Sequence, residues 1–107
     1  MDRNILWVGM VEVEPADYEA SVWPPNCGAY CTVVAMATNE MDYRARVTEA
    51  VVAQGFRVVG MEEIETLAAR SRNFELPASL LALAEAASQE SPVVLGSFHR
   101  FTLEGLS

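Results

Sequence analysis

Residues 29–64, AYCTVVAMATNEMDYRARVTEAVVAQGFRVVGMEEI, decide the fold because their apolar period changes from two to three or four and back. The β-branched beginning of the stretch predicts a central strand. Residues 39–55 predict an amphipathic helix with an apolar stripe made by Tyr43, Val47, Ala50 and Val51. Asn39 suits the N-cap of this helix, and Gly55 suits the left-handed position after its end. A second strand at 56–64 completes a strand, helix, strand unit.

Further elements flank this unit on both sides. Residues 4–14 begin apolar and end in alternation, which predicts a strand that is buried first and solvated later. Residues 65–73 could add a turn or two of helix. A second main helix is expected at 78–90, with Pro77 in its first turn, and a last strand at 93–104.

The expected order is therefore ββαβαβ in one domain that covers residues 1–107. It predicts a two-layer α+β sandwich with an approximately four-stranded, mixed or antiparallel sheet and both main helices on one face. The other face would be polar, covered by the 15–27 loop, or paired with a second copy. Because Leu6, Val8 and Met10 alternate with further apolar residues, we expect a homodimer through the sheet or its edge.

Composition restricts the partners. Fifteen acidic residues stand against seven basic ones, none of which is lysine, so the net charge is −8. Such a field repels phosphate backbones, which argues against nucleic acid, and attracts a basic protein or a cation. Solubility alone could equally explain it. The apolar runs are far shorter than the ~20 residues that cross a bilayer, and the N-terminus resembles a strand and not a signal peptide, so we expect no membrane contact and a cytoplasmic location.

The loop at 15–27 is rich in proline and aromatic residues. It carries Tyr18 and Trp23 beside Asp17 and Glu19, and large aromatic side chains in irregular segments are enriched at binding surfaces. An alternative is that these aromatic side chains fold down as a lid over the open face of the sheet.

Both cysteines lie in the segment WPPNCGAYC, at positions 27 and 31. In an extended chain, Cys27 and Cys31 stand about 13 Å apart, a spacing that fits neither a disulfide nor shared zinc ligation. A bend at Gly28 would instead put Cys27 in the loop, but two sulfurs and at best His99 are still fewer than the four ligands of a structural zinc. We expect buried, reduced thiols and no metal. Because no phosphate-binding glycine pattern or nucleophile elbow is present, no cofactor is expected either.

His99 is the only histidine. It could act as a general base, with Cys31 or Ser97 as a nucleophile and Arg100 nearby. Alternation from Val93 through Leu95 instead predicts a partly buried, structural histidine, so no catalytic residue is assigned.

Glu62, Glu63 and Glu65 form an acidic group at the end of the second strand of the unit. Alternation sends Glu62 to one face and the other two to the opposite face, so at most two carboxylates converge, too few for a strong cation site. Together with Asp17, Tyr18, Glu19, Trp23, His99 and Arg100, these glutamates are the candidate binding residues.

The segment 28–65, with its "QGF" at the helix end, and the closing GSFHRF resemble small bacterial α+β proteins, some of which are similar to immunity proteins that neutralise a partner toxin. This resemblance implies no catalytic residues. It favours a non-enzymatic, acidic protein-binding protein of inhibitor or immunity type, whose partner would be basic. The alternatives are a dimeric module that binds a small molecule and a small enzyme that uses His99.

Overall fold

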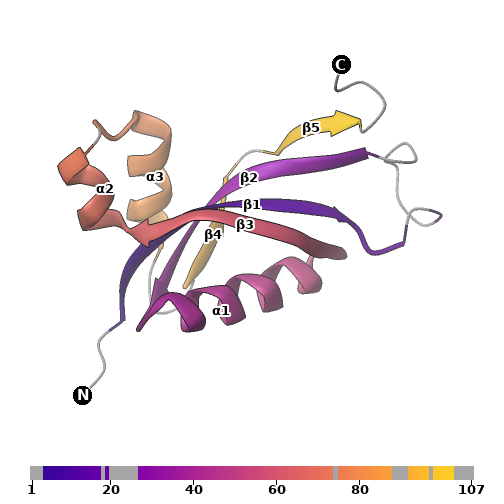
Figure 1. Cartoon of the computed structure of the whole chain (residues 1–107), viewed down its shortest axis with the longest axis horizontal. Coiled ribbons are helices and arrows are strands. Elements are labelled where there is room, and N and C mark those ends of the chain that lie inside the picture. The colour runs from indigo at the N-terminus through magenta and orange to yellow at the C-terminus, as the bar shows by residue number, and fades with distance from the viewer. Residues whose placement is uncertain are drawn as a thin grey trace.

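One β-sheet runs through the molecule (Figure 1). The computed structural model describes residues 4–17, 19, 27–73, 75–87, 92–96 and 98–102, with the backbone alone described for Cys27 and 99–102. The strands are β1 (Ile5–Pro15), β2 (Cys27–Ala37), β3 (Phe56–Thr66), β4 (Val93–Leu95) and β5 (His99–Thr102). The sheet is four strands wide, because β4 and β5 both pair with the same strand, β2. The order is β3-β1-β2-β4, β5 also pairs with β2, and all pairs are antiparallel. The four-stranded α+β sandwich is confirmed.

Helix α1 (Glu40–Ala53) covers one face of this sheet (Figure 1). Its buried residues Tyr43, Val47 and Val51 pack against the odd-numbered side chains of β1 and β2, among them Val11 and Val33. The expected caps are present. The Asn39 side chain accepts a hydrogen bond from the backbone N–H of Asp42 at 2.8 Å, and Gly55 has a φ of 88°.

Helices α2 (Leu67–Asn73) and α3 (Ala78–Ala86) lie on the opposite face, at one end of the sheet (Figure 1). Leu80 of α3 packs against Val8 and Val34, which are even-numbered residues of β1 and β2. The expectation that both main helices share one face is therefore wrong. The reason is that the first half of β1 and the end of β2 are apolar on both sides, so each side requires a cover.

The last strand is shorter and less regular than expected. Residues 93–95 and 99–102 both pair with β2, but three residues lie between Leu95 and His99, whereas two lie between their partners Val33 and Tyr30. The extra residue belongs to an interruption between β4 and β5. At its start, the N–H of Gly96 donates to the carbonyl of Thr32 at 2.8 Å, and a Cβ on Gly96 would lie 2.9 Å from that oxygen. This close approach of two backbones requires glycine.

Strand β3 contains two further irregularities where it pairs with β1. The register shifts between Val8 and Met10 and again between Glu12 and Val13. Glu63 lies at the first shift, with a φ of 55°, the one positive value for a non-glycine residue in the described part of the chain. Each bulge adds a residue to β3 and so changes which of its side chains share a face with β1.

Two expected boundaries also change. Pro77 is the N-cap of α3 and not part of its first turn, and the helix ends at Ala86, earlier than the expected residue 90. Residues 88–91 lie outside the described part of the chain. None of the described helices has the length and hydrophobicity to span a membrane.

Candidate protein-binding surface

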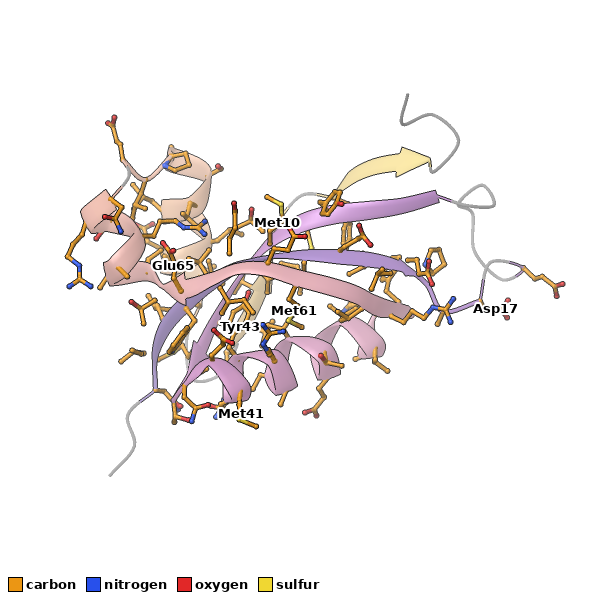
Figure 2. The ribbon with its side chains drawn as sticks, viewed as in Figure 1. Met10, Asp17, Met41, Tyr43, Met61 and Glu65 are labelled. Carbon is orange, nitrogen blue, oxygen red and sulfur yellow. The ribbon has the colours of Figure 1, made fainter. Side chains whose placement is uncertain are left out.

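Part of the sheet surface opposite α1 is not covered by α2 or α3, and we call it the open face. Six residues define it: Met10, Glu12, Tyr30, Val59, Gly60 and Glu62. The strand register brings them together. Glu12 lies between Tyr30 on β2 and Gly60 on β3, and Met10 pairs with Glu62. Figure 2 shows Met10 on the side of the sheet away from α1, whereas Met61 points towards that helix.

The apolar residues of the open face are exposed. Met10 is 37% exposed, Tyr30 is 36% exposed and Val59 is 51% exposed. Val59 sits in the second bulge of β3, between the residues that pair with Glu12 and Val13. Exposed apolar side chains that form a group and have polar residues around them are typical of interaction surfaces.

A hollow of about 210 Å³ lies between these side chains. Gly60 is among its lining residues, and a Cβ placed on Gly60 would meet no atom within 4 Å. Glu12 and Glu62 both line the hollow, and so do Met10 and Tyr30. The open face therefore combines an apolar depression with two carboxylates.

The electrostatics of the open face are negative. A hydrogen bond with Glu12, followed by burial and by the charges of Glu12 and Glu62, raises the pKa of Tyr30 above its ordinary value. The Tyr30 hydroxyl consequently stays a neutral donor to Glu12. Further along β1 and β3, Arg57 of β3 forms an ion pair with Glu14 of β1, so the charge of this arginine is already neutralised. The open face thus offers negative charge without a cation among its own six residues.

A second depression lies between the sheet and the two helices of the same side, and we call it the helix-side groove. Its volume is about 580 Å³, and its lining includes Thr32, Glu63, Glu65, Arg70, Leu80 and Leu83. Arg70 donates to the Glu65 carboxylate at 3.1 Å and to the Glu63 carbonyl at 2.9 Å. These two bonds hold the bulged strand against α2, so the Arg70 side chain has a structural role here.

The three glutamates predicted as one acidic group divide differently from the expected pattern. Simple alternation puts Glu62 on one face and Glu63 with Glu65 on the other. In the structure, Glu62 pairs with Met10 and Glu65 pairs with Val8, so both lie on the face opposite α1. The alternation prediction is wrong because the bulge at Glu63 shifts the pattern by one residue. Glu62 borders the open face, and Glu63 and Glu65 line the helix-side groove.

The predicted loop residues are only partly described. Asp17 and Glu19 are exposed, and the Asp17 carboxylate accepts a hydrogen bond from the backbone N–H of Glu19 at 3.0 Å. Tyr18 and Trp23 lie outside the described residues. Whether the loop binds a partner or covers the sheet stays a prediction.

The backbone of His99 and Arg100 belongs to β5, and their side chains lie outside the described residues. The register places His99 opposite Tyr30 and Arg100 opposite Ala29. Val93 and Leu95, by contrast, are opposite the core residues Ala35 and Val33. His99 therefore does not continue the alternation of Val93 and Leu95, because the register of β5 against β2 is shifted by one residue relative to that of β4.

The cysteine prediction can be checked at Cys31, which is 1% exposed and has a free thiol. Burial raises the pKa of this thiol to about 11. A protonated, inaccessible thiol is not a nucleophile. Cys27 and Cys31 both belong to β2, so the backbone between them is extended. In the described part of the chain, no group of three or more histidine, cysteine, aspartate or glutamate residues is placed to hold a metal ion.

Of the six residues of the open face, sequence reasoning names only Glu62 as a candidate binding residue. The other five fall in predicted strands, and the pattern does not assign them to a site. Their exposure depends on the strand register and on where α3 ends, and a sequence pattern reports neither.

A comparison of the chain with protein-family models, curated proteins and solved structures found no match.

Proposed function

We propose that this protein is a non-enzymatic binding protein, and that its open face binds a basic protein partner as an inhibitor or immunity-type factor would. One observation carries the proposal: exposed Met10, Tyr30 and Val59 form a group with the carboxylates of Glu12 and Glu62. Apolar contact area supplies affinity, while complementary charge steers association and selects the partner.

The charge argues for a basic partner and against a second copy of this chain. A symmetric dimer through the open face would bring Glu12 and Glu62 of one copy against the same residues of the other. Like charges in such an interface cost free energy. The net charge of −8 adds a long-range repulsion between copies and a long-range attraction towards a basic surface. A homodimer through a sheet edge stays a separate prediction.

The experiment compares two variants with the same change in net charge. Glu12→Gln/Glu62→Gln removes the carboxylates of the open face, and Glu49→Gln/Glu85→Gln removes two exposed carboxylates on α1 and α3. Each protein is immobilised, exposed at low salt to a lysate of the source cell, and eluted with salt. The eluted proteins are identified, purified and titrated back by calorimetry.

We expect the wild type and the helix variant to bind one and the same basic protein, with an affinity that falls as salt rises. The open-face variant should bind it at least tenfold more weakly. Retention of no basic protein at low salt, or equal losses in the two variants, would contradict the proposal.

The helix-side groove favours a second candidate, a module that binds a small molecule. Its volume of about 580 Å³ falls within the ~300–1,000 Å³ typical of ligand sites, and it combines hydroxyl, guanidinium and leucine side chains. A metabolite screen by thermal shift tests this alternative, because a ligand at 100 times its Kd adds ~2.7 kcal/mol. Ser79 is an exposed residue that also lines the groove. A true ligand of the groove should lose its effect in Ser79→Tyr, whose larger side chain would occupy part of the groove.

A further inference from the structure

The hollow of the open face has the size of a single side chain. Its volume of about 210 Å³ is below the ~300–1,000 Å³ of sites for drug-sized ligands. The hollow lies on the sheet itself. Tyr30 of β2, Glu12 of β1 and Gly60 of β3 form one row across the strands, and the space where a side chain of residue 60 would stand is open.

The lining matches the two halves of a long basic side chain. Met10 and Val59 are apolar and could contact an aliphatic stem, as buried stems of lysine and arginine do elsewhere. Glu12 and Glu62 supply carboxylates for the charged head. Tyr30 adds an aromatic ring, whose face attracts a cation. A metal ion is a poorer occupant, because two carboxylates fall short of the 6–8 oxygen ligands that calcium takes.

We propose that the hollow over Gly60 receives one lysine or arginine side chain of the partner, with its stem along Met10 and Val59 and its charged head between Glu12 and Glu62. This inference rests on the proposed function, since it identifies the anchor of the same interface. Because insertion buries methylene groups as well as pairing charge, it predicts a dependence on side-chain length that surface electrostatics alone does not produce.

The first test uses the unmodified protein and two peptides of equal charge. Octalysine is compared with octa-2,4-diaminobutyrate, whose side chains are two methylene groups shorter, at a pH where both are fully charged. Binding is followed by NMR through the backbone amide of Gly60 and the methyl group of Met10. We expect octalysine to shift both signals and to bind about three- to tenfold more tightly than the shorter peptide. An octa-arginine arm shows which basic head is preferred.

The second test fills the hollow without changing any charge. Position 60 accepts a side chain sterically, so Gly60→Ala should bind octalysine almost as the wild type does, and Gly60→Leu should bind it several-fold more weakly. The amide spectrum of each variant verifies its fold. Since the chain has no lysine, carbodiimide cross-links to lysine side chains report the peptide, and we expect them at Glu12 and Glu62 in preference to Glu49 and Glu85.

The outcomes separate this inference from the function on which it rests. If octalysine does not perturb the open face of the wild type at low salt, the proposed function loses its support. If octalysine does bind there and depends on Glu12 and Glu62, but binds Gly60→Leu as well as the wild type and no better than the shorter peptide, the insertion is overturned while the acidic binding face stands.

Discussion

At the residue scale, Gly9 and Tyr43 depend on each other. A Cβ on Gly9 would lie 2.8 Å from the Tyr43 hydroxyl oxygen, which is buried and donates to the carbonyl of Val33 at 2.8 Å. The hydroxyl cannot move away without losing this bond. Gly9→Ala should therefore lower the free energy of unfolding by about 1–3 kcal/mol in urea titrations, as overpacking of a core does.

The control is Gly60→Ala, where the added methyl group meets no atom within 4 Å and should change stability by less than about 0.5 kcal/mol. Removing the hydroxyl in Tyr43→Phe eliminates the shortest of the predicted close contacts, so Gly9→Ala should cost less in that background than in the wild type. Additive effects of the two substitutions would show that the hydroxyl is not the obstacle.

At the element scale, the bulge in β3 is held by a residue in an unfavourable conformation. Glu63 has a φ of 55°, which costs an L-residue about 1–2 kcal/mol and suits glycine. Glu63→Gly should be at least as stable as the wild type in thermal unfolding, and Glu63→Val should be less stable. At the neighbouring position, Glu62→Gly should destabilise by about 0.5–1 kcal/mol, because ordinary strand backbone gains nothing from glycine. If Glu63→Gly and Glu62→Gly both stabilised the protein, or both destabilised it, the bulge at Glu63 would be contradicted.

The start of α1 is an element whose stability depends on pH. The Asp42 carboxylate accepts a hydrogen bond from the N–H of Thr38 at 2.9 Å and pairs with Arg46, and these interactions, the first above all, lower its pKa. A carboxyl whose pKa is lower in the folded state stabilises the fold above its unfolded pKa, about 3.9, and loses that contribution as pH falls through the folded value. The wild type should exceed Asp42→Asn in stability at neutral pH, and the difference should disappear in acid. The Glu85→Gln variant, which removes one carboxylate from an exposed helix position, is the charge-matched control.

At the scale of the whole molecule, the net charge of −8 predicts opposite effects of salt on folding and on binding. Self-repulsion destabilises the folded state, and salt screens it within a Debye length of ~10 Å at 0.1 M. We expect the urea midpoint of the free protein to rise modestly as salt increases from low values, while the affinity for octalysine or a basic protein partner falls. Parallel changes of the two measurements would contradict the electrostatic account of the open face.

Alternation predicted the faces of side chains only where the strands are regular. In β1 and β2 the odd-numbered core residues, such as Val11 and Val33, follow the pattern expected from their sequence. In β3 the bulge at Glu63 shifts the pattern. A one-residue difference in register between β4 and β5 does the same for the backbone position of His99. A bulge depends on how two strands pair, so neither strand alone contains its signal.

The sequence by itself determined the order of the main elements, the helix from Asn39 to Gly55 and the acidic character of the surface, because periodicity, capping and charge are local properties. Only the tertiary structure decided that α3 lies opposite α1, that the described helices leave part of that sheet face uncovered, and that Tyr30, Glu12 and Gly60 form one row across three strands. Those features depend on strand register and on long-range packing, which arise when distant segments meet. The negative charge of the candidate site was therefore predictable from the sequence, but its position on the sheet was not.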